Sequence, residues 1–497
     1  MNWNSRNTEK KETGEQQGKS GKKKHSDQKT NRNILGMTYL VVLLFVGMLG
    51  YFGYFLQIKS EQIINNSYNS RLDSFSDRVV RGQILSNDGT ILAQTMIAED
   101  GQEIRNYPYG PLFSHVVGYS SKTKGKTGIE ALGNFYMLTS HVNLLEQTVN
   151  ELSDKKNLGD HLYTTLDLEL QKIAYDALGD RRGAVVVMKP DTGQILAMVS
   201  KPDYDPNTLE TNWESLVSEE NDQAQLLNRA TQGLYPPGST FKIVTLLEYM
   251  REYPENYRDF TFDCDGHYEA GEYDIRCYHE TAHGHQDLDL GFANSCNGVF
   301  ASLGQELDLN RLKHTTQSLL FEKELPLTLP YKKSRYTMEE GAELWEILQT
   351  SIGQGNTQLT PMHNAMIMSA IANGGILMTP YLMEHVENAG GETIKKFMPG
   401  SYGSLMSAQE AGVLTEFLTG VVTTGTGSAV RTDAYTVAGK TGSAEFEAGK
   451  ESHAWFVGFA PVENPQLVVS VLVEEGGSGG KAAAPVARSI FDAYFFR

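Results

Sequence analysis

The sequence is poor in cysteine, with three in 497 residues, which excludes a dense disulfide scaffold. Basic residues are also in deficit, with 43 Lys and Arg against 61 Asp and Glu. The deficit lies beyond the N-terminus, because residues 1–32 carry nine basic and four acidic side chains, which leaves a net charge of −23 for the rest. Phosphate repels so acidic a body, so we expect no nucleic-acid partner.

Charge is absent from one long apolar run, Ile34 to Leu56. As a helix, its 23 residues would span roughly 34 Å, enough to cross a bilayer core with some tilt. A cleaved signal peptide would have a shorter apolar stretch and a small-residue cleavage site, whereas Gln57, Ile58 and Lys59 follow this run. The run is therefore predicted to be an uncleaved transmembrane anchor.

Basic residues gather immediately before this anchor: Lys22, Lys23, Lys24, Lys29 and Arg32. Because positive charge is retained on the cytoplasmic side, residues 1–33 are predicted to be a cytoplasmic tail and residues 57–497 to lie outside the cell membrane. The tail is polar and rich in Gly, Ser and Lys, a composition typical of disorder. We expect a protein that crosses the membrane once.

Beyond the anchor, the chain is long enough for two domains, and 40% of all residues are hydrophobic. Residues 57–160 mix short apolar runs with Asn, Ser and Gly, including a strand and tight turn near Asn87-Asp88-Gly89. Later runs predict strands over Gly183–Met188, Gln194–Ser200, Ala454–Phe459 and Leu467–Glu474, and helices over Phe241–Arg251, Met338–Leu348 and Ala482–Phe496. Strands at both ends of a region with helices between them predict one α+β domain whose sheet joins distant segments.

A serine–lysine pair stands where two prolines and a glycine lead into an apolar helix. Lys242 follows Ser239 by one helical turn, so its amine can reach the serine hydroxyl. A serine at a helix start is usually only a cap, and Ser-x-x-Lys is common by chance. The pair alone does not define a site.

Two further motifs follow in a set order, Ser295-Cys296-Asn297 and then Lys440-Thr441-Gly442-Ser443. This trio is typical of penicillin-binding proteins and serine β-lactamases. The chain thus resembles a class B penicillin-binding protein, a membrane-anchored peptidoglycan D,D-transpeptidase. Further blocks that match this family are Arg81–Ile84, Asn228–Ala230, Ser351–Gly355, Ile371–Gly375 and His453–Phe456.

The resemblance implies an α+β fold, a penicillin-binding transpeptidase or serine β-lactamase-like domain with a central antiparallel sheet flanked by helices. It implies four parts: a tail (1–33), a transmembrane anchor (34–56), a small mixed pedestal domain (57–160) and a transpeptidase domain (161–497). The implied function is cross-linking of peptidoglycan stem peptides through a serine acyl-enzyme, which β-lactams also form. A membrane glycosyltransferase of wall synthesis is the implied partner, and the chemistry needs no cofactor.

The resemblance also assigns the acylation chemistry. Ser239 would attack the penultimate D-Ala carbonyl of a stem peptide, and Lys242 would accept the serine proton. A lysine must be neutral to act as a base, and burial and the nearby charge of Lys440 both lower a lysine pKa. The backbone N–H groups of Ser239 and Ser443 would bind the oxyanion.

The remaining motif residues would relay a proton and bind the substrate. Ser295 would pass a proton toward the leaving nitrogen, and Asn297 would hold the amide of the donor peptide. Lys440 and Thr441 would bind the terminal carboxylate of that peptide. Gly442 would let the strand backbone approach the ligand.

Three cysteines and one histidine converge between the first two motifs: Cys264, Cys277, His283 and Cys296. One interpretation is a Cys264–Cys277 disulfide, which is chemically allowed outside the cell, with Cys296 as a small buried residue. Another is a structural Cys₃His zinc site that braces the Ser295 loop from behind. The third alternative is neither. Cys296 should point away from the substrate if its two neighbours in the motif face it.

Two other motifs resemble functional sites of other kinds. His279-Glu280-Thr281-Ala282-His283 matches the H-E-x-x-H motif of zinc peptidases, but that chemistry needs a helix, and Gly284 follows at once. Lys126-Thr127-Gly128 repeats the Lys-Thr-Gly motif but precedes Ser-x-x-Lys, so we assign it no catalytic role. A zinc peptidase is therefore the alternative from another class of enzyme.

Other proteins share the trio or could keep it without using it. A β-lactamase must deacylate quickly, and no deacylating glutamate can be identified from the sequence. A carboxypeptidase also carries the trio, and a membrane β-lactam sensor would need a larger cytoplasmic domain than the predicted tail. A non-catalytic scaffold for a glycosyltransferase is disfavoured because the trio is complete.

Overall fold

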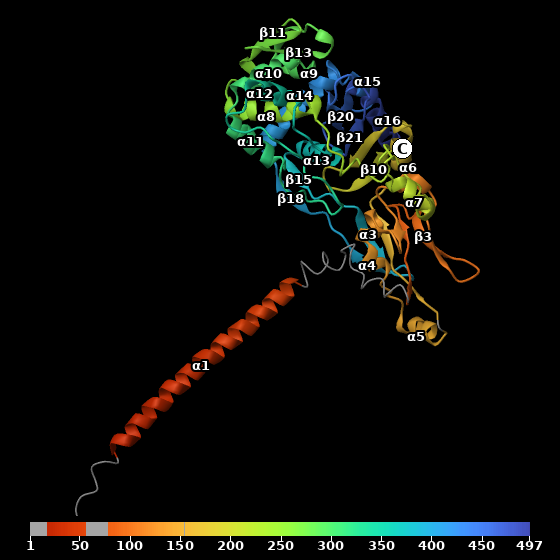
Figure 1. The fold of residues 1–497 in the computed structure, drawn as a ribbon, viewed down its shortest axis with the longest axis vertical. Helices are drawn as coiled ribbons and strands as arrows, with labels where there is room; N and C mark the ends of the chain where they lie inside the picture. Colours follow the sequence, from red (N-terminus) through yellow and green to blue (C-terminus); the bar gives the residue numbers. More distant parts are fainter. Residues whose placement is uncertain (1–16, 56–77, 154) are drawn as a thin grey trace, which may run out of the picture. The chain divides into compact units, whose positions relative to one another are not determined.

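The computed structural model describes residues 17–55, 78–153 and 155–497. The chain divides into two compact units, residues 1–66 and 67–497. The described part of the first unit is helix α1 (Gln17–Tyr54), drawn in red in Figure 1. Its segment Asn31–Tyr54 is long and apolar enough to cross a membrane, as predicted, while Leu56 lies outside the described residues.

Helix α1 begins inside the tail whose composition predicts disorder. The structure gives residues 17–33 as helix, which differs from that expectation, and residues 1–16 lie outside the described part of the chain. Lys, Arg and Gln have good helix propensity, and extending an existing helix costs less than nucleating a new one. The apolar run therefore supports a helix that continues into the polar tail.

The second unit is built around a five-stranded antiparallel sheet in the order β10-β9-β21-β20-β19. Figure 1 labels β10, β20 and β21 of this sheet. Its strands are β9 (Gly183–Met188), β10 (Ile195–Lys201), β19 (Ala438–Ala444), β20 (His453–Ala460) and β21 (Leu467–Val473). Strands β9, β10, β20 and β21 were predicted to within one residue at each end. Val471 of β21 lies opposite Val185 of β9, so the sheet joins distant segments, as the α+β prediction requires.

Helices cover both faces of this sheet. The two hydrophobic cores divide β9 residue by residue, with Ala184, Val186 and Met188 in one and Val185 and Val187 in the other. This follows because successive side chains of a strand point to opposite faces. Helix α13 (Pro361–Ala372) packs on the first face, and α6 (Leu168–Leu178) and α16 (Ala484–Phe495) pack on the second.

The helices that follow the motifs agree in part with the sequence. A 3₁₀ turn, η5 (Gly238–Phe241), leads into α8 (Lys242–Glu252), close to the predicted helix. The predicted helix Met338–Leu348 is wrong at its start, because α12 runs from Leu344 to Ser351. Gly341 adopts a φ of +85° in the turn before α12, a conformation that glycine reaches without strain.

Smaller elements surround the second and third motifs. The helices are α7 (Leu209–Val217), α9 (Leu288–Ala293), α10 (Asn297–Glu306), α11 (Leu309–Ser318), α14 (Ala408–Thr423) and α15 (Gly479–Ala482). The two-stranded sheets are β11 (Thr261–Cys264) with β14 (Gly284–Asp287), β12 (His267–Ala270) with β13 (Tyr273–Arg276), and β15 (Ile376–Met378) with β18 (Ser401–Ser404). Short 3₁₀ turns are η4 (Pro206–Thr208), η6 (Tyr257–Asp259), η7 (Tyr278–Glu280) and η8 (Ser428–Val430). Strands β11 and β13 contact α10, which begins inside the second motif.

A second sheet, of six strands, has the order β17-β16-β8-β2-β3-β4. It contains β2 (Ile84–Leu85), β3 (Ile91–Ile97), β4 (Glu103–Asn106), β8 (His161–Thr164), β16 (Met383–Glu387) and β17 (Thr393–Lys396). Around it lie β1 (Val79–Val80), β5 (Ser120–Ser121), β6 (Gly125–Lys126), β7 (Asn157–Leu158), η3 (Gly110–Phe113), α3 (Gly128–Leu132), α4 (Asn134–Met137) and α5 (Leu144–Leu152). The predicted turn joins β2 to β3. Strands β16 and β17 come from far along the chain, which the sequence pattern did not indicate.

Candidate active site

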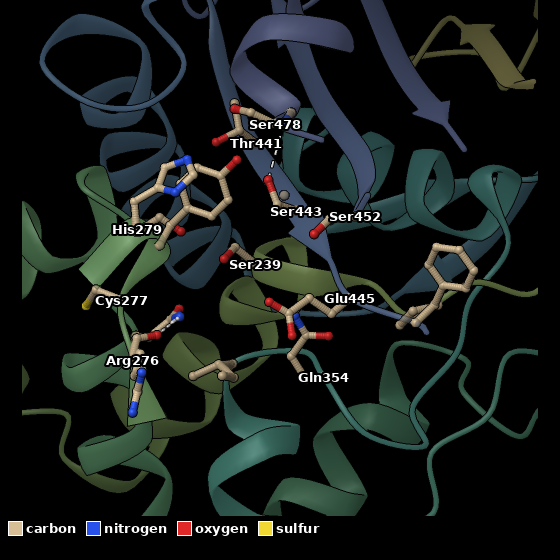
Figure 2. A pocket seen from close by; sticks show the side chains of 18 of the residues that line it. Ser239, Arg276, Cys277, His279, Gln354, Thr441, Ser443, Glu445, Ser452 and Ser478 are labelled. Atoms are coloured by element: carbon tan, nitrogen blue, oxygen red, sulfur yellow. Dashed lines mark hydrogen bonds between the residues drawn. The ribbon is translucent and has the colours of Figure 1, made fainter. Parts of the chain in front are cut away.

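The three motifs meet at one large cavity of about 1280 Å³ beside the central sheet. The motif residues that line it are Ser239, Ser295, Asn297, Thr441, Gly442 and Ser443. Figure 2 shows Ser239 facing this cavity next to Thr441 and Ser443. Lys242 and Lys440 are fully buried and reach the lining through hydrogen bonds. The structure thus brings together all eight residues predicted from the motifs.

Ser239 is placed by the backbone of its turn. The N-cap of η5 is Pro237, so Ser239 is a first-turn residue and not the cap. Gly238 has a φ of +52°, and a Cβ on it would lie 2.7 Å from the carbonyl oxygen of Ser443. Its N–H donates to the Gly353 carbonyl at 2.9 Å. Only glycine fits this turn between two walls of the cavity.

Lys242 is the first residue of α8, and its side chain is fully buried. Its Nζ donates to the Ser295 carbonyl at 2.7 Å, to Asn297 Oδ1 at 2.7 Å and to the Ser295 hydroxyl at 3.4 Å. Burial lowers the pKa of Lys242 to about 8, although the charges of Cys296 and Cys277 oppose this. At pH 7 such a pKa leaves roughly a tenth of the amine neutral and able to accept a proton.

Lys440 lies on β19 and is also fully buried. Its Nζ donates to Ser295 Oγ at 2.9 Å and to the Thr441 carbonyl at 3.1 Å. Burial, and then the like charge of Lys242, lower the pKa of Lys440 well below its usual value. The two lysines therefore meet at Ser295, whose φ of +56° is a strained conformation for a residue with a side chain.

Strand β19 carries the third motif at the edge of the central sheet, where it pairs with β20 alone among the described strands. The Thr441 hydroxyl lies 2.6 Å from the Thr426 hydroxyl. A Cβ on Gly442 would lie 3.1 Å from the Pro237 carbonyl and 3.2 Å from Thr240 Cγ2. Gly442 thus lets β19 approach the Ser239 turn, and its approach to a ligand stays a prediction.

The four residues Cys264, Cys277, His283 and Cys296, which we call the thiol cluster, lie together at the second motif, with their ligand atoms all within 4.8 Å of one another. Cys277 and His283 also line the cavity. The Sγ atoms of Cys264 and Cys277 are 3.7 Å apart, as are those of Cys277 and Cys296. Cys264 Sγ lies 3.4 Å from His283 Nδ1. All three thiols are free, so the disulfide interpretation is wrong. Cys296 is fully buried within the thiol cluster and is not among the residues that line the cavity, which agrees with the expectation that it points away from the substrate.

Hydrogen bonding within the thiol cluster separates its thiol pKa values. The contact with Cys296, and then that with His283, lower the pKa of Cys277, although burial opposes them. The same contact with Cys277, together with burial, raises the pKa of Cys296. A thiolate at Cys277 is the form of cysteine that binds metals.

The two alternative motifs are not built for catalysis. His279 has a φ of +54° in the turn η7, so the H-E-x-x-H residues do not share a helix face, and His283 turns to the thiol cluster instead. Lys126-Thr127-Gly128 runs from the last residue of β6 to the first residue of α3, where Gly128 packs on the backbone of Val116 and Val117. Neither arrangement offers the geometry of a zinc peptidase or of a second active site.

Sequence reasoning missed two parts of the site. The loop 445–452 between β19 and β20 lines the cavity, and its Phe446 ring stacks on His453 with centroids 4.1 Å apart. Behind the Ser239 turn, the Tyr235 hydroxyl donates to Glu474 at 2.7 Å. The sequence of the loop is that of an ordinary charged surface loop. No sequence pattern links Tyr235 to Glu474, which lie 239 positions apart.

Comparison with protein families gives two matches. The profile of the penicillin binding protein transpeptidase domain matches residues 183–492, more than half of the chain. The profile of the penicillin binding protein A dimerisation domain matches residues 81–162. Both matches fall within the second compact unit.

Individual proteins agree with these profiles. The peptidoglycan D,D-transpeptidase PbpA of Mycolicibacterium smegmatis is 32% identical over 447 residues, which cover 84% of this chain and 89% of the relative. The D,D-transpeptidase domain structure of a peptidoglycan glycosyltransferase from Eggerthella lenta is 35% identical, with a TM-score of 0.76 over 84% of this chain and 98% of that one. Penicillin-binding protein A of M. tuberculosis, solved as a ceftriaxone acyl-enzyme complex, is 28% identical, with a TM-score of 0.76 over 85% and 99% of the two chains. The chain belongs to the penicillin-binding protein transpeptidase family.

Proposed function

We propose that this protein is a peptidoglycan D,D-transpeptidase that cross-links stem peptides through an acyl-enzyme on Ser239 and is acylated there by β-lactams. The observation that carries the proposal is the meeting of the three motifs at one cavity, with two buried lysines hydrogen-bonded to Ser295. Acyl transfer needs a nucleophile, a base and oxyanion donors, and the proposal assigns these roles to Ser239, to Lys242 and to the backbone N–H groups of Ser239 and Ser443. No cofactor enters this chemistry.

Acylation would begin with transfer of the Ser239 hydroxyl proton to neutral Lys242. The Ser239 oxygen attacks the carbonyl carbon of the penultimate D-Ala, and the N–H groups of Ser239 and Ser443 bind the resulting oxyanion. The C–N bond then breaks, and the terminal D-Ala leaves as an amine after receiving a proton through Ser295. Ser295 suits this relay because it accepts hydrogen bonds from both lysines.

The second half-reaction would return the enzyme to its starting state. An amine of a neighbouring stem peptide attacks the ester carbonyl, loses a proton to Lys242 and expels the Ser239 oxygen, which takes a proton back. The products are a peptide cross-link and the enzyme with its Ser239 hydroxyl restored. A β-lactam would react only as far as the acyl-enzyme. The amine that is released when its ring opens stays attached to the acyl group and cannot leave the site.

Substrate binding would use the groups around the nucleophile. Lys440 and Thr441 would bind the terminal carboxylate of the donor, as their place on the edge strand β19 allows. Asn297 already accepts from Lys242 and donates to the Arg276 carbonyl at 2.8 Å. Its Oδ1 keeps a second lone pair for the donor amide.

The test of this proposal is labelling of the full-length protein with a fluorescent penicillin. Wild type should be labelled on Ser239, as mass spectrometry of the labelled peptide would show, and Ser239→Ala should not be. Ser452→Ala is the matched control, because Ser452 lines the same cavity outside the motifs. Label that persists in Ser239→Ala would overturn the nucleophile assignment.

Product analysis distinguishes transpeptidation from carboxypeptidase and β-lactamase activity. Incubation with a pentapeptide donor and an amine acceptor should release D-Ala and yield a joined product. Release of D-Ala with only hydrolysed donor would indicate a carboxypeptidase instead. Rapid loss of the penicillin label would indicate a β-lactamase.

The same proposal gives the protein its place in the cell. The apolar part of α1 would be the single anchor, with residues 1–33 in the cytoplasm and 57–497 outside, divided into pedestal (57–160) and transpeptidase (161–497) domains. A membrane glycosyltransferase would be the partner, because cross-linking consumes the strands that such an enzyme makes. Protease added to intact spheroplasts should digest residues 57–497 and spare the tail, and the reverse pattern would contradict this orientation.

We further propose that the thiol cluster holds a structural zinc ion. Tetrahedral zinc with Zn–S bonds of about 2.3 Å sets two sulfurs about 3.8 Å apart, and the Sγ–Sγ distances of 3.7 Å fit this spacing. Three cysteines and a histidine are a common ligand set for structural zinc. Because Cys296 lies inside the second motif and Cys277 follows Arg276, whose carbonyl accepts from Asn297, the ion would hold that motif in place.

Elemental analysis of full-length protein, purified anaerobically, tests the zinc proposal. Wild type should contain close to one zinc per chain, and a chelator should lower its unfolding midpoint. Cys264→Ser should lose most of the metal, whereas His285→Asn, an exposed histidine outside the cluster, should keep it. Zinc below about a tenth of an equivalent in wild type, against the one ion that four ligands would hold, would overturn the proposal.

A further inference from the structure

The segment 235–238, directly before Ser239, is tied to parts of the fold that lie far away in the sequence. The backbone of Tyr235 exchanges hydrogen bonds of 3.1 and 2.9 Å with Leu359. The indole of Trp455, on strand β20 of the central sheet, donates to the Pro236 carbonyl at 3.0 Å. Together with the Gly238 contact already described, these bonds hold the chain on each side of the Tyr235 side chain.

The Tyr235 side chain ends on a buried charge network. Its hydroxyl donates to Glu474 Oε1 at 2.7 Å, where Arg229 Nε also donates at 2.8 Å. Arg182 Nε donates to Glu474 Oε2 at 3.0 Å. The Arg229 side chain is 1% exposed and that of Glu474 is 11% exposed. The phenol therefore meets a carboxylate whose own position is fixed by two guanidinium groups.

Gly233 makes room for this arrangement. A Cβ on Gly233 would lie 2.5 Å from the nearest ring carbon of Tyr235 and 2.6 Å from its hydroxyl oxygen. The ring also packs edge-on against His453 and Trp455, with centroids 5.4 and 6.2 Å away. The phenol is thus confined by its ring as well as by its hydroxyl.

Ser239 depends on this support because its own hydroxyl has no hydrogen bond to another described residue. The position of Ser239 Oγ is therefore set by the backbone that leads to it. A displacement of about 1 Å at a reacting atom can cost on the order of 10²-fold in rate. A buried ionic network is also weak evidence of stability, since apolar side chains of similar volume often stabilise as well or better.

We propose that Tyr235 and Glu474 are positioning residues for Ser239: the carboxylate fixes the phenol, and the phenol fixes the turn that carries the nucleophile. Neither residue touches the substrate or exchanges a proton with it. The inference rests on the proposed acylation of Ser239, and it concerns the rate of that step. Loss of the Tyr235–Glu474 hydrogen bond should slow bond formation and leave initial binding of the β-lactam unchanged.

The experiment measures acylation of the full-length protein by penicillin G in detergent, resolved into the binding constant Ks and the acylation rate constant k2. Tyr235→Phe should lower k2 by about tenfold or more, while Ks stays within about twofold of wild type. The matched control is Tyr435→Phe. Tyr435 is similarly buried and donates to Asp492 at 2.6 Å, a carboxylate paired with Arg488, but it packs in a different hydrophobic core, away from the Ser239 turn.

A second variant approaches the same contact from the other side. Gly233→Ala should push the Tyr235 ring away from Glu474 without removing either polar group, and it should lower k2 in the same way. This variant carries the test should Tyr235→Phe fail to fold.

Each outcome decides between the alternatives. The proposal is wrong if both variants keep k2 within about twofold of wild type, or if Tyr435→Phe lowers k2 as much as Tyr235→Phe does. Unaltered k2 with a raised Ks would also overturn it, because it would place Tyr235 in binding. If wild type itself takes no label on Ser239, the proposed function fails, and this inference fails with it.

Discussion

Acylation should accelerate with pH through the titration of Lys242. A base must be neutral to accept the serine proton, and burial lowers the pKa of Lys242 to about 8. The neutral fraction then rises from roughly 0.1 at pH 7 to roughly 0.5 at pH 8, so k2 should increase about fivefold over that interval and level off above about pH 9. A lysine with an ordinary pKa near 10.4 would instead give about a tenfold rise per unit up to about pH 10.

The position of the plateau thus measures the effect of burial on this amine. The assay is k2 for a penicillin between pH 6 and 9.5, on full-length protein whose folding is checked at each pH. A k2 that is independent of pH, or that falls as pH rises, would refute Lys242 as the base.

Two further predictions come from packing. Gly238→Ala should lower both k2 and the unfolding midpoint, because its Cβ would lie 2.7 Å from the Ser443 carbonyl oxygen. Gly341 also has a positive φ but has open space around it, so Gly341→Ala is the control. Equal effects of the two substitutions on k2 would contradict this reasoning. Glu130→Gln should destabilise the protein by about 3–5 kcal/mol, because two buried arginines pair with this fully buried carboxylate at 2.6 and 2.7 Å and would be left uncompensated. Thermal unfolding measures the second effect, and an unchanged midpoint would contradict it.

The motifs could be located from the sequence because their internal spacing is local. One helical turn separates Ser239 from Lys242, and the apolar run after Lys242 predicts the helix that carries it. Strands β9, β10, β20 and β21 of the central sheet could also be predicted, because both of their faces are buried and they therefore appear as apolar runs. No such run marks β19, which carries the third motif. The resemblance to a known family rested on the same local patterns.

Other features were hidden because their cause is not local. The helix predicted from Met338 begins only at Leu344, since tertiary packing overrides a short apolar pattern. Strands β16 and β17 join the N-terminal sheet from residues 383–396, and no periodicity signals which sheet an edge strand will join. The choice between a disulfide and separate thiols at Cys264 and Cys277 likewise depended on a distance, 3.7 Å.

By itself, the sequence determined which groups are available: a serine one turn before a lysine, a second lysine far along the chain, an apolar helix near the N-terminus, and three cysteines and a histidine in one stretch. Only the tertiary structure decided their electrostatics and their support. The low pKa of Lys242 exists because packing removes water from the amine. The contact between Tyr235 and Glu474 exists because β21 ends beside the Ser239 turn. Desolvation and long-range contact are properties of packed atoms, so chemistry can be read from residue types while reactivity depends on where the fold places them.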